Sequence, residues 1–245
     1  MLINNTVEKL NQLKLNGIAK ALQDQMSNSA TLSLSFEDRL GLLIDHEQSY
    51  RDNLRQERLL KAAKLKSVGA CVEDIDYASK RGLDRTIVAN LISSDWVSKG
   101  FNLIITGPTG TGKTWLGCAF GNQACRKGFT VQFCRLPLLL EEMRIAHGDG
   151  TYRRKLMQLA KVDLLILDDF GISTIDSESR NDLLEIVDGR TSTKSTLITS
   201  QLPVDKWHNY LSLGNPTVAD AIMDRLLTNE TRLTLSGESM RRQKR

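Results

Sequence analysis

The segment that most restricts the fold of this chain is the glycine-rich run GPTGTGKT at residues 107–114. It matches the pattern G-x-x-x-x-G-K-[ST] and directly follows LIIT, a run short and apolar enough for a buried strand. A helical pattern begins in its last residues. A strand, a glycine turn and a helix in this order direct backbone N–H groups and the helix dipole at one anion. The run therefore predicts a phosphate-binding loop in an α/β fold.

The residue types in this loop suit a nucleoside triphosphate. Gly107, Gly110 and Gly112 let the backbone bend around phosphate oxygens. Lys113 is expected to reach the β- and γ-phosphates, and Thr114 to place its hydroxyl on Mg²⁺. The cofactor that the loop predicts is ATP or ADP with Mg²⁺. The complete set of candidate nucleotide-binding residues is Gly107, Pro108, Thr109, Gly110, Thr111, Gly112, Lys113 and Thr114.

Further short apolar runs follow the loop along the chain. They lie at residues 130–136, 164–169, 195–200 and 232–236. Their hydrophobicity is continuous rather than alternating, which is typical of strands buried on both faces. Helical patterns separate the runs, so crossover connections are needed. We therefore expect a mostly parallel sheet of five strands.

An acidic pair stands at the end of the third strand, in LLILDDFG. Asp168 is expected to hold Mg²⁺ through water, and Asp169 to polarise the water that attacks the γ-phosphate. The same letters contain D-F-G, but no H-R-D loop precedes it and the glycine-rich loop differs from that of a protein kinase. The fourth strand ends in Thr199, Ser200 and Gln201, which are able to hold the attacking water or sense the γ-phosphate.

Residues 1–68 carry only helical patterns, with a break expected at Asn16 and Gly17 and a helix start at Ser35. The end of this region is strongly basic. On a helical wheel the basic side chains fall within an arc of about 140°. A solvated helix face and a nucleic-acid-binding face are equally consistent with this stripe. Its residues are Arg51, Arg55, Arg58, Lys61 and Lys66.

Composition adds little about partners but restricts the compartment. A formal charge of +4 leans towards a polyanionic partner. The start of the chain has no cleavable signal pattern, and no apolar stretch approaches membrane-spanning length. The four cysteines include no C-x-x-C pair, which suits buried thiols in a reducing compartment. We expect a cytoplasmic protein that does not enter a membrane.

Near the end of the chain, ADAIMDRLL at residues 219–227 has a helical pattern that includes one arginine, Arg225. On a helix it projects at the border of an apolar arc that contains Val218, Ile222 and Leu226. Taken alone, an arginine at that position most simply packs its stem and extends its head group into water.

Several motifs together resemble the IstB-like ATPases of insertion sequences, which are transposition helpers of the AAA+ superfamily related to helicase loaders and to the initiator DnaA. The resemblance runs over nearly the whole chain. It implies an AAA+ core at residues 69–245, with strand order 5-1-4-3-2, after a small all-helical domain at residues 1–68. The motifs are the phosphate loop, LLILDDFG, STLITSQLPVDKWH, NPTVADAIMDRLL, GESMRR and, near the start, LSLSFEDRLGLLIDHE.

The resemblance also implies roles for single residues. Lys113 and Thr114 correspond to Walker A, and Asp168 and Asp169 to Walker B. It implies ATP-dependent homo-oligomers on double-stranded DNA, largely without sequence preference, that stimulate a partner transposase. The residues that it marks for catalysis are Lys113, Asp169, Ser200 as sensor 1, Arg225 as arginine finger, and Arg241 as sensor 2 with Arg242 beside it.

Two segments bear on how subunits and DNA would meet. The segment at residues 136–163 lies where the initiator and loader branch inserts an extra helical element. Its basic residues either face DNA phosphates or form a solvated surface. About 45 residues follow the fourth strand, too few for a full helical lid, so the nucleotide pocket should be open to a neighbouring subunit. The basic residues of the segment are Arg144, Arg153, Arg154 and Lys155.

Three alternatives remain open at this level. A replicative helicase loader would share the ATPase core but bind a helicase and single-stranded DNA. A small-molecule phosphotransferase with the same loop would be a monomer whose ATP turnover ignores DNA. A DNA-binding scaffold would use the nucleotide only as a structural element.

Overall fold

The computed structural model describes residues 2–77, 81–212 and 215–240. These residues form two compact units, one that ends at Arg58 and a larger one that begins at Leu59. The units divide before the boundary at residues 68 and 69 expected from the sequence. The reason is that Leu59, Leu60 and Ala63 pack into the core of the larger unit.

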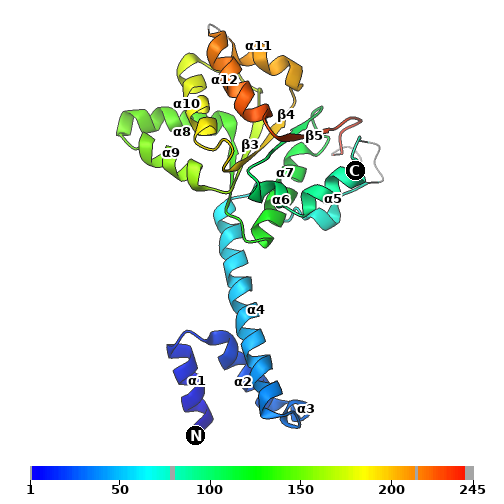
Figure 1. The fold of residues 1–245 in the computed structure, drawn as a ribbon, viewed down its shortest axis with the longest axis vertical. Coiled ribbons are helices and arrows are strands. Elements are labelled where there is room, and N and C mark those ends of the chain that lie inside the picture. Colours follow the sequence, from blue (N-terminus) through cyan, green and yellow to red (C-terminus); the bar gives the residue numbers. More distant parts are fainter. Residues whose placement is uncertain (1, 78–80, 213–214, 241–245) are drawn as a thin grey trace. The chain divides into compact units, whose positions relative to one another are not determined.

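The N-terminal unit is entirely helical, as Figure 1 shows. The start expected at Ser35 is confirmed, because its hydroxyl accepts a hydrogen bond from the Asp38 backbone N–H at 3.1 Å. The break expected at Asn16 and Gly17 lies instead at residues 13–15, where Lys14 has φ 59°. The helices of the unit are α1 (Leu2–Gln12), α2 (Asn16–Ser27), α3 (Ser29–Leu32) and the first part of α4 (Phe36–Ala63).

Gly17 serves helix packing rather than chain reversal. A Cβ at this position would lie 2.8 Å from the Cα of Glu47 in α4, so only glycine permits the close approach. The Glu47 carboxylate accepts hydrogen bonds from the Ile18 N–H at 3.0 Å and from Arg51 Nε at 2.7 Å. Burial alone would raise the pKa of Glu47, but the hydrogen bonds from Arg51, Ile18 and Gly17 hold it below its ordinary value. Glu47 therefore satisfies the start of α2, which has no side-chain cap of its own.

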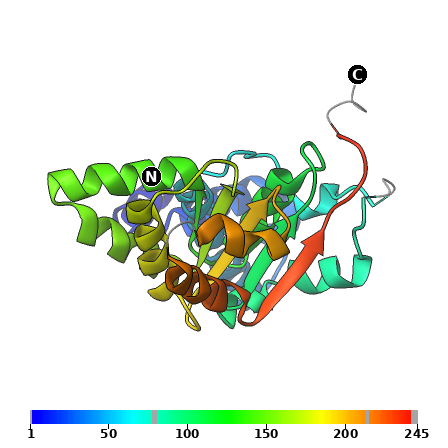
Figure 2. The same ribbon diagram turned by 90° about the horizontal axis from the view of Figure 1, so that it is seen from above.

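The larger unit is built on a parallel sheet with strand order β2-β3-β4-β1-β5. This is the expected order 5-1-4-3-2 read from the other edge, so the prediction is confirmed. Figure 2 shows β5 at one edge of the sheet. The strands are β1 (Asn102–Thr106), β2 (Val131–Arg135), β3 (Leu164–Phe170), β4 (Ser195–Ser200) and β5 (Glu230–Thr234).

Helices cover both faces of this sheet, which explains the continuous hydrophobicity of the strands. In β1, Leu103 and Ile105 pack into the core under α7, whereas Ile104 faces a second core on the other side. The first core is covered by α5 (Arg85–Ile92), α6 (Asp95–Ser98) and α7 (Lys113–Arg126). The second is covered by α8 (Leu136–Asp149), α9 (Tyr152–Lys161), α10 (Ser177–Asp188), α11 (Trp207–Leu211) and α12 (Pro216–Leu227).

Two features of the larger unit match expectations about the regions outside the sheet. Helices α8 and α9 form the extra helical element between β2 and β3. In the part of the chain that the structure describes, no helix follows β5. Among the same residues, no helix has the length and apolar character required to cross a membrane.

Candidate nucleotide-binding site

The phosphate loop joins β1 to α7 at the carboxyl edge of the sheet. Three loop glycines have positive φ values: 149° at Gly107, 87° at Gly110 and 92° at Gly112. Glycine is favoured in this region because it has no Cβ. Helix α7 begins at Lys113, immediately after Gly112. Its first turn therefore adjoins the loop, which is the arrangement that binds phosphate.

Polar contacts hold the loop in shape. The buried Lys113 donates through Nζ to the carbonyl oxygens of Gly107 at 2.7 Å and Pro108 at 2.8 Å. Thr111 donates to the same Pro108 carbonyl at 2.9 Å. Thr109 donates to Gln201 Oε1, beyond the end of β4, at 2.6 Å. The Lys113 ammonium thus lies within the loop where a phosphate would replace carbonyl oxygens as its partner.

Asp168 in β3 faces the start of α7 and is fully buried. Its Oδ1 accepts hydrogen bonds from the hydroxyls of Thr114 at 2.7 Å and Thr199 at 2.5 Å. Its Oδ2 is also buried and has no hydrogen-bond partner among the described residues. An unsatisfied carboxylate oxygen beside a threonine hydroxyl is a ligand set that fits Mg²⁺ or its bound water.

Asp169 is turned away from Asp168 by an irregularity in the strand. The register between β3 and β4 shifts between Leu167 and Phe170, and Asp169 has φ 64°. This left-handed conformation, unusual for a non-glycine residue, gives a local bulge that aims the side chain. Asp169 Oδ2 lies 2.9 Å from Nε of Arg135, which ends β2. Arg135 was not predicted as a site residue, although its position at a strand end is a usable signal in the sequence.

At the end of β4 the polar side chains divide between two sides of the strand. Ser200, expected as sensor 1, is buried, and its hydroxyl donates to the Phe170 carbonyl at 2.7 Å. Thr199 contacts Asp168, and Gln201 contacts the phosphate loop through Thr109. The polar side chains of this strand end that meet the site are therefore Thr199 and Gln201.

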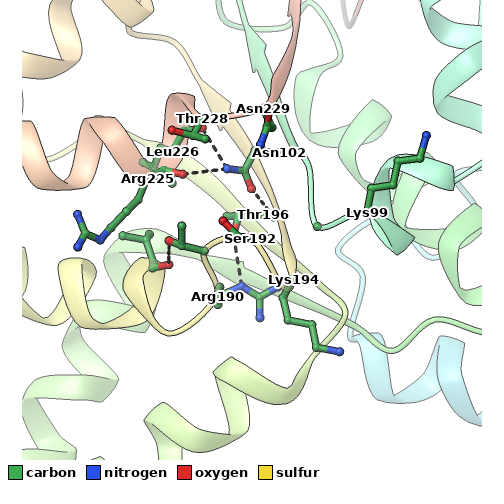
Figure 3. A pocket seen from close by; sticks show the side chains of 13 residues that line it. Lys99, Asn102, Arg190, Ser192, Lys194, Thr196, Arg225, Leu226, Thr228 and Asn229 are labelled. Atoms are coloured by element: carbon green, nitrogen blue, oxygen red, sulfur yellow. Dashed lines mark hydrogen bonds between the residues drawn. The ribbon is translucent and has the colours of Figure 1, made fainter.

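Arg225 lies at the amino-terminal end of the parallel strands, whereas the phosphate loop lies at their carboxyl end. Its backbone carbonyl accepts a hydrogen bond at 3.1 Å from Asn102, the first residue of β1, whereas the loop follows the last. The length of β1 separates the two by about 13 Å at a rise of about 3.3 Å per residue. The Arg225 side chain pairs with Asp188 Oδ1 at 2.5 Å and donates to the Ala221 carbonyl at 3.0 Å. Figure 3 shows it extending away from Asn102.

Arg190 and Arg225 line one pocket, shown in Figure 3, and Arg190 has a structural role there. It is buried and donates to the carbonyl oxygens of Leu159, of Val162 at 2.9 Å and of Ser195 at 2.5 Å. Burial lowers the pKa of the Arg190 guanidinium to about 10. Its hydrogen bonds tie the end of α9 to the start of β4.

The C-terminal segment reaches the phosphate loop. The Met240 N–H donates to the Gly110 carbonyl at 3.0 Å, and the Ser239 side chain fills the space where a Cβ of Gly110 would be. The expected sensor 2 residues, Arg241 and Arg242, come next in the sequence but lie outside the described residues.

The basic stripe expected on one helix is only partly formed. Helix α4 ends at Ala63, and Lys64 has φ 51°, so the chain leaves the helix before Lys66. The assignment of Lys66 to the stripe is therefore wrong, and its ammonium lies 3.7 Å from Asp168 Oδ2 instead. The members that do lie on α4 are Arg51, Arg55, Arg58 and Lys61.

The basic residues of α8 and α9 differ in their partners. Arg144 pairs with Glu141 at 2.7 Å, and Lys155 with Glu142 at 3.3 Å. Arg153 and Arg154 are exposed, and within the described ranges neither forms an ion pair.

A parallel sheet of this order, a phosphate loop at the end of β1 and an acidic pair at the end of β3 define a P-loop nucleotide-binding protein. The family described as IstB-like ATP binding protein matches residues 8–245. The chain belongs to this family of ATP-binding proteins.

Individual relatives agree with this assignment. The chain is 52% identical over 203 residues to the ATP-binding protein of insertion sequence IS1162 from Pseudomonas fluorescens, covering 83% of this chain and 88% of that protein. It is 47% identical over 245 residues to the insertion sequence ATP-binding protein y4pL from Sinorhizobium fredii, covering 100% and 99%.

Solved structures support the fold. The chain resembles DnaI with TM-score 0.58 and 22% identity, over 74% of this chain and 92% of that one. It resembles the DnaC helicase loader with TM-score 0.54 and 19% identity, over 68% and 96%. It also resembles the initiator DnaA bound to AMPPCP and single-stranded DNA, with TM-score 0.56 and 20% identity, over 69% and 50%.

Proposed function

We propose that this protein is an ATP-dependent, DNA-binding transposition helper. It hydrolyses ATP, assembles as a homo-oligomer on duplex DNA in the cytoplasm and stimulates a partner transposase. Two relatives that match it over most of its length are named as ATP-binding proteins of insertion sequences, which supports the link to transposition. The observation that supports assembly is the position of Arg225, which lies at the start of β1 and so remote from its own phosphate loop. As an arginine finger it would therefore act on the nucleotide of a neighbouring subunit.

Binding of ATP requires few changes in the site. Lys113 exchanges the Gly107 and Pro108 carbonyls for phosphate oxygens. Thr114 and Asp168 would hold Mg²⁺, because the Asp168 Oδ2 atom lacks a hydrogen-bond partner among the described residues and the Thr114 hydroxyl lies beside the same carboxylate. When bound, the metal ion neutralises charge on the β- and γ-phosphates.

Hydrolysis then depends on the carboxyl ends of β3 and β4. Asp169 polarises the attacking water, and Arg135 positions its carboxylate through their ion pair at 2.9 Å. Gln201, which already contacts the loop through Thr109, senses the γ-phosphate. Arg241, as sensor 2, follows the segment in which Met240 contacts Gly110.

Arg225 completes the site of the neighbouring subunit as an arginine finger. To do so its guanidinium exchanges Asp188 for the neighbour's γ-phosphate. A monomer therefore hydrolyses ATP slowly, and assembly on DNA accelerates the reaction. Because no helix follows β5 among the described residues, we expect the nucleotide to be accessible to this neighbour.

DNA binding is assigned to basic side chains that face solvent. Arg153 and Arg154 on α9 are exposed, with no ion pair within the described ranges. Arg51, Arg58 and Lys61 add an exposed stripe on α4. Contacts of this kind go to phosphates, so binding is salt-sensitive and largely independent of sequence.

A replicative helicase loader is the second candidate, because DnaC, one of the similar folds, is named as a helicase loader. Pull-downs with the partner transposase and with a replicative helicase separate the two. Capture of the transposase supports the helper. Capture of the helicase alone supports the loader.

The enzymatic part of the proposal is tested by ATP turnover with and without duplex DNA. Wild-type protein should hydrolyse ATP faster on DNA, and Lys113→Ala should lose both nucleotide binding and turnover. Turnover that ignores DNA in a monomeric protein would instead favour a small-molecule phosphotransferase. Normal transposition by a variant without turnover would favour a DNA-binding scaffold.

A further inference from the structure

A cation beside the buried oxygen of Asp168 comes from outside the motifs described so far. Lys66 Nζ lies 3.7 Å from Asp168 Oδ2, the atom that lacks a hydrogen-bond partner among the described residues. Its side chain is 48% exposed, whereas that of Asp168 is 0% exposed. Lys66 thus reaches from solvent to the side of the carboxylate that Thr114 and Thr199 leave open.

The backbone around Lys66 is fixed by buried neighbours. Ala63, Leu65 and Ala70 all belong to the core between the sheet and α7. Leu65 fits there because α7 has Gly121 at the contact, where a Cβ would lie 3.0 Å from the Leu65 side chain. Lys66 follows Leu65 directly, so its position at the end of β3 is set by packing rather than by a free surface chain.

We propose that Lys66 is a positioning residue of the nucleotide site, the counter-ion of Asp168 when the site is empty, and that Mg²⁺ must displace it. The inference rests on the proposed binding of Mg²⁺ and ATP. The new element is that Lys66, in the segment after α4, competes with the metal ion for Asp168.

The physical reason is that one buried oxygen cannot serve both cations. In the empty site Lys66 offsets the charge of a fully buried carboxylate, which would otherwise be costly. When Mg²⁺ or its bound water takes Oδ2, the ammonium meets like charge and withdraws into solvent, which its half-exposed position allows. Lys66 therefore weakens metal binding.

The displacement also links the metal to the N-terminal side of the core. Lys66 stands shortly after the end of α4 at Ala63. Release of Lys66 from Asp168 removes a contact between this segment and β3. The occupied and empty sites thus differ in how tightly the segment after α4 is held.

The test is a Mg²⁺ titration of nucleotide binding by the full-length protein. A fluorescent, non-hydrolysable ATP analogue is held at fixed concentration at physiological ionic strength. The protein is first freed of divalent metal with a chelator, and Mg²⁺ is then added stepwise. Lys66→Met should lower the Mg²⁺ concentration at half-maximal binding by about threefold, the range expected for a partly exposed ion pair. Binding without Mg²⁺ should be unchanged.

Matched variants separate competition from general charge effects. Lys66→Arg keeps the cation and should behave as wild type, and Lys66→Gln should repeat the shift if Lys66→Met folds poorly. Lys127→Met removes an exposed charge at the end of α7 remote from the phosphate loop and should leave the midpoint unchanged. If the Mg²⁺ midpoint is unchanged or higher in both neutral Lys66 variants, the role of Lys66 is overturned, whereas the proposed function is not affected. Failure of the wild type to bind the analogue at all would overturn the proposed function with it.

Discussion

Arg225 and Asp188 form an ion pair, with 2.5 Å between Nε and Oδ1, at the amino-terminal end of the parallel strands, away from the phosphate loop. The pair joins α12 to the end of α10. It holds the arginine in a defined position, and the proposed arginine finger would have to leave Asp188.

Arg225→Ala is expected to spare ATP binding but to lower DNA-stimulated hydrolysis by about 10³-fold, because an arginine finger stabilises charge only in the transition state. Nucleotide affinity and turnover are measured on the same preparation. Arg126→Ala, which removes another arginine of a surface ion pair, is the control and should leave turnover unchanged. Normal turnover by Arg225→Ala on DNA would mean that this arginine serves only its ion pair with Asp188.

Asp169→Asn should bind ATP and assemble on DNA but hydrolyse about 10² times more slowly, since the amide is a poor base. Asparagine tolerates the left-handed backbone of this position, so the variant should keep the stability of the wild type. Single-turnover hydrolysis and thermal unfolding check the two expectations. If Asp169→Asn keeps the wild-type rate of hydrolysis, a group other than Asp169 must act as the base.

The sequence predicted the strands, their parallel arrangement and the phosphate loop because each depends on local pattern, whereas the strand order came from the family resemblance. Buried runs mark strands, and the glycines that the loop needs for positive φ are visible as letters. Contacts between distant segments were not visible. Lys66 was assigned to a helical stripe because the left-handed conformation of Lys64 cannot be anticipated from helical periodicity. Gly17 was assigned to a helix break because its packing against Glu47, thirty residues away in another helix, is not visible in the local sequence.

The same limit applies to the site. Asp168 and Asp169 are adjacent in sequence, but the bulge in β3 gives them different partners, Thr114 and Arg135. The alternation of side chains at the end of β4 decides that Thr199, rather than Ser200, reaches Asp168. The sequence therefore predicted that the site lies at the ends of the strands. Which side chain plays which role could be assigned only from the geometry.

The stability of the N-terminal unit should depend on the ionisation of Glu47. Because hydrogen bonds lower its pKa in the folded state, its contribution is fully present above its ordinary pKa of 4.5 and is lost as the pH falls through the lowered value. Glu47→Gln should reduce amide-exchange protection in α2 at pH 7, by about 1.5 kcal/mol, and make little difference in acid. The exposed Glu57→Gln is the control. Equal protection in Glu47→Gln and wild type at pH 7 would contradict this role.

Arg190→Met should destabilise the larger unit by about 3 to 5 kcal/mol, because it leaves the carbonyls of Leu159, Val162 and Ser195 buried without their donor. Urea unfolding measures the effect. Lys194→Met removes a more exposed ion pair with Asp163 and should cost about 1 kcal/mol or less. Equal costs for the two variants would contradict the structural role of Arg190.

The central claim, assembly through a nucleotide shared between subunits, is tested most directly by sedimentation of the protein with duplex DNA in ATP and in ADP. Assemblies larger than a monomer should form on DNA with ATP, and should be lost with ADP and in Arg225→Ala. A protein that remains monomeric on DNA with ATP would contradict the account.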